Sequence, residues 1–398
     1  MRILNIIHSV DPVHGGAAEG LRQLVRAGKA MGHHHEVLTL DAPGSPWFES
    51  FPVPLHPAGP SHLGYGYTPR LVPWLQMHAL DFDAVVVHGL WQYHGLAARH
   101  VLRRMGVPYF VFCHGMLDPW FRRQYPLKHL KKWLYWPWGE YRVLRDAHAV
   151  LFTAEEEARL AAQSFWLYRA KPAVVGYGLT LDATALHATA EDFYGVYPQL
   201  RGKRLLLFLA RIHPKKGCDV LIDAFAKLAA ADPSLHLVMA GPDQVGWQRT
   251  LEQQAAALGV AERITWCGMV GGTLKWAALR AAEVFVLPSH QENFGIAVAE
   301  ALAVGVPVLI SDKLNIWREI VAAGAGLAGN DTPAGTESTL RQWLDSTPAQ
   351  RAVMREAAVG CYKRHFEMSA AAQRLVDTIR PHTRLAAPVG QLRLDSQP

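Results

Sequence analysis

The chain has 398 residues, half of them hydrophobic, which is enough for two or more domains and argues against a single compact one. Its net charge of +6 suits nucleic acid, anionic lipid or a phosphorylated substrate as partner, and no zinc-finger or RNA-binding signature favours nucleic acid. Four scattered cysteines and the lack of a signal-peptide or membrane-spanning apolar run predict a cytoplasmic protein without disulfides or a cysteine zinc site.

The first 180 residues alternate short apolar runs with helical stretches, the pattern of a parallel α/β sheet. We expect strands at Ile3–Ile7, Glu36–Leu40, Ala84–His88, Tyr109–Cys113, Ala149–Phe152 and Ala173–Val175. Open parallel sheets bind ligands at the carboxyl ends of their strands. Functional residues are therefore expected in the loops that follow these runs.

The loop after the first strand contains Gly15 and Gly16, just before a helix. The glycine spacing is not G-x-G-x-x-G, so the dinucleotide fingerprint of a hydride-transfer enzyme is absent. A Gly-Gly turn allows the backbone to approach a phosphate or a sugar closely. A tight strand-to-helix turn with no other role is the alternative.

Two histidines end buried runs: His88 closes Ala84–His88, and His114 follows Tyr109–Cys113. At a strand end, His114 could bond a sugar hydroxyl or steady developing positive charge through its carbonyl. The alternative is a buried histidine of the core. Asp81 and Asp83 spell a D-x-D pattern, but they precede a strand instead of following one, so we expect no metal there.

Residues 120–138 mix basic and aromatic side chains. This composition suits a helix lying on anionic lipid, and it predicts a peripheral contact with the inner face of the cytoplasmic membrane. In the alternative interpretation the aromatic rings pack inside the protein and the cations are ordinary surface charges. Further along, Thr153 and Glu156 read as a helix cap with its capping-box glutamate, so these residues are expected to be structural.

The pattern breaks between residues 176 and 203, so we place the domain boundary near 180 and a second α/β domain at 181–380. Its expected strands are Leu205–Leu209, Leu235–Ala240, Ile264–Cys267, Val284–Leu287 and Val306–Ile310. After the first of these come Arg211 and Lys216, which can converge on one diphosphate, Arg211 as a planar fork and Lys216 as a point charge. A basic surface loop is the alternative. Residues 381–398 lack periodicity and are expected to form a flexible tail.

Glu292 and Glu300 lie eight residues apart between two of these strands, with a helix expected from about Gly295 to Val304. The amides of Asn293, Phe294, Gly295 and Ile296 would form its N-terminus, a site for phosphate or sugar oxygens. Glu300 is almost alone among apolar helix residues, which argues against a surface position. The loop acid, the amides and the helix acid together suit a nucleotide-sugar.

Together these motifs resemble the retaining glycosyltransferases of family 4, over nearly the whole chain and most strongly from Leu205 to Glu319. The resemblance implies a GT-B fold of two facing Rossmann-like domains with a cleft between them, the first on the acceptor side and the second on the donor side, with the last helix free to pack back on the first domain. It also implies that no metal or other cofactor is needed.

The resemblance further implies that Arg211 and Lys216 bind the donor diphosphate and that Glu300 binds the ribose. Glu292, with the amides of residues 293–295, would hold the transferred sugar. His114 would lie at the reacting face. The remaining expected contacts are Gly15 and Gly16 near the phosphates and acceptor, and Gly241 and Met269 near the base.

The implied activity is transfer of a hexose from GDP-mannose, or next a UDP-hexose, to a glycan or lipid-linked glycan in bacterial surface polysaccharide or lipopolysaccharide synthesis. Two other functions stay open. A nucleotide-sugar 2-epimerase of the same fold would need no separate acceptor, and an inactive subunit would bind nucleotide-sugar without transfer. Nucleic acid is not an expected partner.

Overall fold

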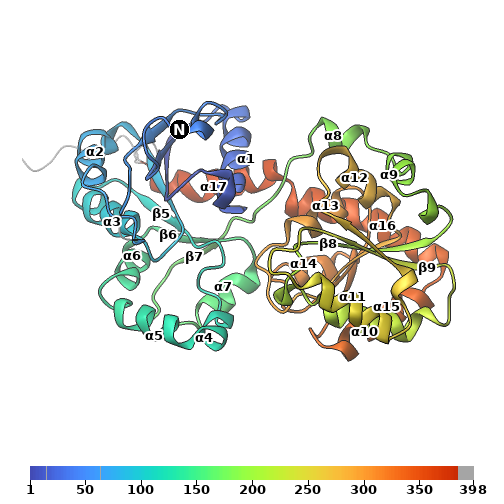
Figure 1. Ribbon diagram of the computed structural model, residues 1–398. Coiled ribbons are helices and arrows are strands. Elements are labelled where there is room, and N and C mark those ends of the chain that lie inside the picture. The colour runs from blue at the N-terminus through green and yellow to red at the C-terminus, as the bar shows by residue number, and fades with distance from the viewer. Residues whose placement is uncertain (15, 63, 384–398) are drawn as a thin grey trace, which may run out of the picture. The chain divides into compact units, whose positions relative to one another are not determined.

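The computed structural model describes residues 1–14, 16–62 and 64–383. It forms two compact units: unit 1 comprises Met1–Tyr177 and the segment from Met368 onward, and unit 2 comprises Gly178–Glu367. In each unit a parallel sheet lies between helices (Figure 1). Both units are therefore α/β, as the alternation of apolar and helical stretches predicted.

Unit 1 contains a seven-stranded sheet in the order β3-β2-β1-β4-β5-β6-β7. Its strands are β1 (Arg2–Ile7), β2 (His34–Thr39), β3 (Leu55–Pro57), β4 (Ala84–His88), β5 (Tyr109–Phe112), β6 (Ala149–Phe152) and β7 (Pro172–Val174). Its helices are α1 (Gly16–Ala30), α2 (Leu71–His78), α3 (Tyr93–Met105), α4 (Trp120–Gln124), α5 (Pro126–Tyr135), α6 (Glu140–Asp146), α7 (Glu155–Ala161) and α17 (Met368–Ile379).

Unit 2 contains a six-stranded sheet in the order β10-β9-β8-β11-β12-β13. Its strands are β8 (Arg204–Leu209), β9 (Leu235–Ala240), β10 (Ile264–Gly268), β11 (Val284–Leu287), β12 (Val308–Ser311) and β13 (Gly326–Gly329). Its helices are α8 (Ala183–His187), α9 (Ala190–Val196), α10 (Cys218–Ala229), α11 (Gln248–Ala257), α12 (Gly272–Ala281), α13 (Ile296–Ala303), α14 (Trp317–Ala322), α15 (Pro333–Asp345) and α16 (Pro348–Cys361).

The strand order in both units is that of a Rossmann-like sheet, which winds one way from its first strand and then the other. The reversal falls between β1 and β4 in unit 1 and between β8 and β11 in unit 2. Ligands of open α/β sheets bind at the carboxyl ends of the strands at such a switch point. The loops after β1, β4, β8 and β11 are therefore where the fold places a site.

The buried strands explain why their positions are visible in the sequence. Every residue of β4, β5, β6, β9, β11 and β12 is buried. A strand covered on both faces reads as a continuous apolar run. Two strands were missed: β3 and β13, edge strands that contain proline or glycine with few apolar residues, whereas the edge strands β7 and β10 were predicted.

The last helix, α17, groups with unit 1, whereas the sequence places residues 368–380 in the second half with the option of packing back. Its buried face, including Met368, Leu375 and Ile379, provides the reason. Of the expected tail at 381–398, residues 381–383 are described, and the His382 ring lies 5.7 Å from the Phe110 ring in unit 1. Residues 384–398 lie outside the described residues.

Candidate active site

The unit 2 loop after β8 contains Arg211 and Lys216, which have different surroundings. The Lys216 ammonium forms an ion pair with the Glu292 carboxylate from the loop after β11, and both side chains are mostly buried. Arg211 is exposed, and its guanidinium donates to Gln244 Oε1 at 2.9 Å. The structure thus joins two residues that the sequence assigned to separate contacts, and it adds Gln244, which the sequence did not indicate.

Glycines allow the loops of unit 2 to come this close. A Cβ atom on Gly217, next to Lys216, would lie 2.3 Å from the carbonyl oxygen of Pro288 after β11. A Cβ atom on Gly241, after β9, would lie 1.8 Å from the carbonyl oxygen of Ala210. Both glycines also have positive φ angles, of 67° and 147°. Side chains at these positions would force apart the loops that carry Arg211 and Lys216.

The Glu292 loop is held by the segment that follows β12. The Glu292 N–H donates to the Lys313 carbonyl at 3.0 Å, and the Asn315 N–H donates to the Glu292 carbonyl at 3.0 Å. The buried Asn315 side chain also donates to Asn293 Oδ1 at 3.0 Å. Asn315 is therefore a support of the site that sequence reasoning missed, because it lies in an irregular segment without a motif.

Helix α13 begins at Ile296, one residue after the predicted start, and Gly295 precedes it with a φ of 70°. A Cβ atom on Gly295 would lie 2.9 Å from the Leu314 side chain, so a larger residue would disturb this turn. No side chain of the described residues caps the helix. The Phe294 ring is buried and packs edge-on against Phe366, which fixes the turn from inside.

Glu300 lies on α13 with only 9% of its surface exposed, so its expected position away from the surface is confirmed. Its carboxylate pairs with the Lys275 ammonium of α12 at 2.6 Å. The pKa of Glu300 is raised overall, because burial and the nearby Asp182 raise it by more than Lys275 lowers it. Lys275 was not predicted, because its helix α12 lies between β10 and β11, whereas α13 follows β11, and no spacing rule connects Lys275 with Glu300.

The predicted base contacts lie on the neighbouring loops of unit 2. The Gly241 N–H donates to the Gly268 carbonyl at 2.7 Å, so the loops after β9 and β10 are in contact. Met269, next in the chain, is 80% exposed. Its side chain therefore takes no part in the core.

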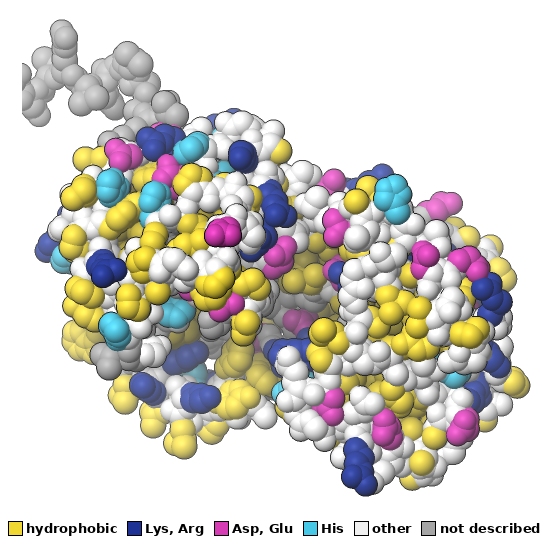
Figure 2. Space-filling model, turned by 45° about the horizontal axis from the view of Figure 1, so that its top comes forward, with side chains coloured by type: hydrophobic (Ala, Val, Ile, Leu, Met, Phe, Trp, Pro, Cys, Tyr) yellow, Lys and Arg dark blue, Asp and Glu magenta, His cyan; other side chains and the backbone are white. Residues whose placement is uncertain are grey.

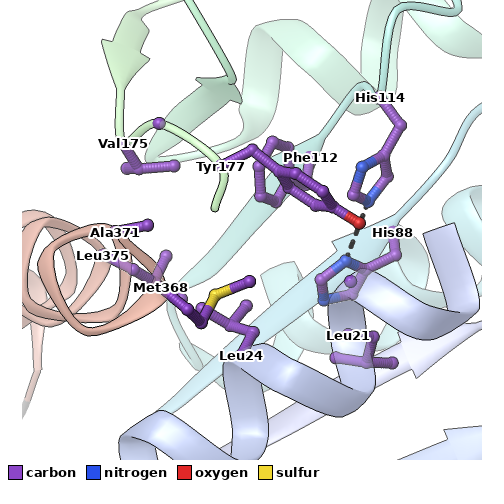
Figure 3. Close-up of a pocket in the computed structure, with 12 residues that line it drawn as sticks. Leu21, Leu24, His88, Phe112, His114, Val175, Tyr177, Met368, Ala371 and Leu375 are labelled. Atoms are coloured by element: carbon purple, nitrogen blue, oxygen red, sulfur yellow. Dashed lines mark hydrogen bonds between the residues drawn. The ribbon is translucent and has the colours of Figure 1, made fainter. Parts of the chain in front are cut away.

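In unit 1 the buried end of β4 and the loop after β5 bring two histidines together. His114 has a positive φ of 49°, and its ring stacks on Phe112 with centroids 4.3 Å apart. His88 Nδ1 and His114 Nε2 are 3.0 Å apart (Figure 3). Burial lowers the pKa of His114 to about 4. At neutral pH the His114 ring is therefore uncharged.

Gly16, the first residue of α1, is linked to this histidine pair by Tyr177. The Tyr177 hydroxyl donates to the Gly16 carbonyl at 2.5 Å. The Tyr177 ring is edge-on to His114 (Figure 3). A Cβ atom on Gly20 would lie 1.3 Å from the Tyr177 hydroxyl, so this glycine makes room for the tyrosine. Gly15 lies outside the described residues. Tyr177 itself carries no sequence signal.

Two buried glutamates hold the backbone beside these histidines. Glu157 accepts from the Gly115 N–H at 2.5 Å and from the N–H and hydroxyl of Thr153 at 2.6 Å each. The predicted capping pair of Thr153 with Glu156 is therefore wrong: Glu156 instead pairs with Arg159. Glu140 accepts from the Trp91 N–H at 2.6 Å in the loop after β4.

The pKa of Glu140 provides a test by pH. Burial raises it from 4.5 to about 7, so the folded state holds the proton more tightly than the unfolded chain. The stabilising contribution is complete below pH 4.5 and is lost as pH rises through about 7. Above that pH, the free energy of unfolding is lower by roughly 3 kcal/mol.

We therefore expect Glu140→Gln to flatten the fall in unfolding free energy between pH 5 and pH 8. Urea unfolding at several pH values measures this slope. Glu49→Gln, at an exposed position of the same unit, serves as the matched control and should keep the original slope. An unchanged slope in Glu140→Gln would show that Glu140 is already ionised at pH 5.

Among residues 1–14, 16–62 and 64–383, no group of three or more histidine, cysteine, aspartate or glutamate side chains is arranged to hold a metal ion. Within the same ranges no helix is both long and apolar enough to cross a bilayer.

Both units match family models. Residues 196–359 match glycosyl transferases group 1, and residues 15–178 match a glycosyl transferase 4-like domain. D-inositol 3-phosphate glycosyltransferase from Nocardia farcinica is 34% identical over 196 residues, covering 48% of this chain and 43% of that protein. The Geodermatophilus obscurus protein of the same name is 32% identical over 240 residues, covering 57% and 50%. The chain thus spans about half or less of these relatives' length.

Solved structures share the fold over nearly the whole chain. Sucrose-phosphate synthase from Thermosynechococcus elongatus has a TM-score of 0.74 at 19% identity and covers 96% of this chain and 98% of its own. Anabaena HepE in complex with UDP and glucose has a TM-score of 0.70 at 18% identity, covering 96% and 99%. At these identities the likeness concerns architecture alone.

Proposed function

Because the chain belongs to the group 1 glycosyltransferases and has the GT-B fold of two Rossmann-like domains, we propose that it transfers a hexose from a nucleotide-diphosphate sugar to a glycan or lipid-linked glycan. The observation that carries this proposal is the pair of ion pairs around α13, Lys216 with Glu292 and Lys275 with Glu300. They lie on loops and helices that follow β8, β10 and β11, beside the switch point of unit 2.

In this proposal Arg211 and Lys216 bind the diphosphate, which leaves with negative charge. Arg211 has its guanidinium at the surface, and Lys216 is held by Glu292. A diphosphate beside Lys216 would compete with Glu292 for the ammonium. The carboxylate would then be available to accept hydrogen bonds from the hydroxyls of the transferred sugar, so one exchange of partners would position both ends of the scissile bond.

Glu300 would accept hydrogen bonds from the nucleotide ribose. A carboxylate offers about four lone-pair positions, and the bond to Lys275 occupies one of them. Because burial favours the protonated form, Lys275 counteracts it by favouring the charged form that the ribose hydroxyls require. Gly241, Met269 and the neighbouring loop would receive the base.

We assign the retaining course and front-face displacement, in which the acceptor attacks from the side that the nucleotide leaves. A phosphate oxygen takes the acceptor proton, so neither Glu292 nor Glu300 is assigned as proton donor. His114, with its carbonyl and an uncharged ring, would face the transferred sugar. The largest contribution of the protein to the rate would be stabilisation of the departing diphosphate. Each charged contact would supply on the order of a few kcal/mol, as in other preorganised sites.

For the donor, GDP-mannose and UDP-hexoses are both proposed. The family resemblance favours GDP-mannose and a role in bacterial surface polysaccharide or lipopolysaccharide synthesis. The HepE structures, solved with UDP and with UDP-glucose, favour a UDP-hexose. The related proteins named D-inositol 3-phosphate glycosyltransferase add a phosphorylated inositol as an acceptor to be tested.

The experiment uses the full chain with a panel of GDP- and UDP-hexoses, in EDTA, with and without inositol phosphate or extracted lipid-linked glycan. Acceptor-dependent release of nucleoside diphosphate, with the α-linked sugar of the donor preserved in the product, is the expected result. A new sugar isomer from donor alone would identify an epimerase. Nucleotide binding without release or transfer under any condition would identify an inactive subunit.

We also propose that unit 1 contacts anionic membrane through α4 and α5. No residue of α5 is buried, and its leucines form a stripe at helical spacing: Leu127, Leu130 and Leu134 are 83%, 55% and 61% exposed. Exposed Lys128 and Lys131 lie on the same helix. Figure 2 shows hydrophobic and basic side chains beside one another at the lower edge of unit 1, where Figure 1 places α4 and α5.

The aromatic residues of this stretch divide between the two interpretations that the sequence left open. Trp136 is fully buried and stacks on Phe165 at 4.5 Å, and the Tyr135 hydroxyl bonds to that of Tyr65. Trp138 is 70% exposed. The buried rings anchor the helix, and the exposed leucines and Trp138 would enter the lipid interface between lysines that bind anionic headgroups.

Liposome flotation tests this contact. We expect the chain to float with vesicles that contain anionic lipid and to stay behind with neutral vesicles, because the apolar stripe alone is small. Leu130→Glu with Leu134→Glu should abolish flotation. Leu186→Glu, an exposed leucine of unit 2, is the matched control. Equal recovery with both vesicle types, or self-association that the double variant removes, would contradict a membrane role.

A further inference from the structure

We propose that Asn5 and His88 are positioning residues that hold His114 in a single tautomer, with the proton on Nε2 and the lone pair on Nδ1. The inference rests on the proposed function, in which His114 faces the transferred sugar. It is carried by a row of polar side chains that crosses neighbouring strands of unit 1, with Asn5 and His88 buried and His114 half-buried. Asn5 lies on β1, His88 ends β4, and His114 follows β5.

The direction of the first hydrogen bond in the row is set by a backbone carbonyl. Asn5 Nδ2 lies 3.3 Å from the backbone carbonyl of Glu36, which can only accept a hydrogen bond. The amide NH₂ therefore points to β2, and Asn5 Oδ1 points the other way. Asn5 Nδ2 also lies 3.3 Å from His35 Nδ1, which accepts from it. Asn5 is completely buried, so water does not compete for these bonds.

Each later proton position follows from the one before. Asn5 Oδ1 lies 3.2 Å from His88 Nε2, and since an amide oxygen only accepts, His88 Nε2 carries a proton. Burial places the pKa of His88 well below 6.5, so its ring is neutral and Nδ1 has the lone pair. His88 Nδ1 lies 3.0 Å from His114 Nε2, which must therefore donate (Figure 3).

The hydrogen-bonding role of the other His114 ring nitrogen, Nδ1, follows from this. Its ring is also neutral, because burial lowers its pKa to about 4, so a proton on Nε2 leaves Nδ1 with a lone pair only. Stacking on Phe112, with planes 18° apart, holds the ring orientation. His114 Nδ1 can accept a hydrogen bond from a sugar hydroxyl but cannot donate one to its oxygen.

Nitrogen NMR of the full chain with ¹⁵N-labelled histidine tests the tautomer directly, because protonated and unprotonated ring nitrogens have well-separated shifts. His114 signals are identified by their loss in His114→Gln. At pH 7 we expect His114 protonated at Nε2 only. His88→Leu removes the acceptor and should give a mixture of tautomers, whereas His88→Asn places an amide oxygen near the Nδ1 position and should keep the single form.

The same variants separate positioning from folding. His88→Leu should lower kcat about tenfold or more with little change in donor KM, and His88→Asn should recover most of the loss. His148→Leu, at the opposite end of the sheet just before β6, is the matched control for replacing a histidine of the same unit. Thermal unfolding of each variant identifies any that fails to fold, and Asn5→Leu then provides a second disruption of the row.

His114 protonated at Nδ1 in the unaltered chain would overturn the proposal, as would a single unchanged tautomer in both His88→Leu and Asn5→Leu. Failure of the proposed function is a distinct result. In that case no acceptor-dependent sugar transfer would be detected, while the NMR spectra would still show whether the row fixes the tautomer.

Discussion

Lys216→Ala is expected to lower the rate of sugar transfer by roughly a hundredfold or more, which corresponds to about 2.7 kcal/mol of transition-state stabilisation. Its ammonium would meet the charge that develops on the departing diphosphate. The variant also leaves the Glu292 carboxylate, which is only 19% exposed, without its ion-pair partner. An unpaired carboxylate beside the diphosphate would add repulsion to the loss of attraction.

This second effect can be separated by a double-mutant cycle. Glu292→Gln in the Lys216→Ala background should recover part of the donor affinity, because it removes the repulsion, but not the lost rate. Arg211→Ala should give a loss of similar size without this recovery, since Arg211 bonds to the neutral Gln244. Initial rates of nucleoside diphosphate release at several donor concentrations measure both quantities.

The matched control for Lys216 is Lys227→Ala. Its ammonium pairs with Glu337 at 3.0 Å on the surface of the same unit, so the variant removes an ion pair without touching the proposed site. Exposed pairs of this kind contribute little. Near-normal transfer by Lys216→Ala or by Arg211→Ala would remove that residue from the diphosphate site.

Glu300→Ala is the second large expected effect: a loss of roughly ten- to a hundredfold in nucleotide affinity, with a smaller change in the rate at saturating donor. A carboxylate that accepts from ribose hydroxyls makes charge-assisted hydrogen bonds, each worth about 1.5–3 kcal/mol. The variant also frees Lys275, whose ammonium lies 4.4 Å from the Trp276 ring centre. Titration calorimetry with a nucleoside diphosphate measures the affinity.

Lys275→Ala sharpens this test. Without Lys275, burial dominates the surroundings of Glu300 and its pKa rises further, so nucleotide affinity should fall more at pH 6 than at pH 8. Glu337→Ala, at the surface pair with Lys227, should bind nucleotide normally. Unchanged affinity in Glu300→Ala would refute the ribose contact, whatever the transfer rate.

The strands of both sheets could be read from the sequence wherever they are covered on two sides. Val284–Leu287 is buried throughout and was predicted at the same residues, because a parallel strand between helices has no polar face. The edge strands Leu55–Pro57 and Gly326–Gly329 could not be read, since they are short and contain proline or glycine in place of a run of apolar residues, unlike the edge strand Ile264–Gly268, which was predicted. Their identity depends on the neighbour with which they pair.

The sequence by itself determined the charged residues at the ends of strands, because burial of the strands confines charge to the loops that follow them. Three residues of this kind are Arg211, Lys216 and Glu292. Glu300 lies inside α13 and was singled out by its isolation among apolar helix residues. Tertiary structure alone decided their partners. Lys275, Gln244 and Asn315 approach them from elements distant in the chain, and no local spacing encodes such contacts. The proton position on His114 is likewise decided by tertiary structure alone, since it depends on Asn5, on His88 and on the Glu36 carbonyl, which lie on three different strands.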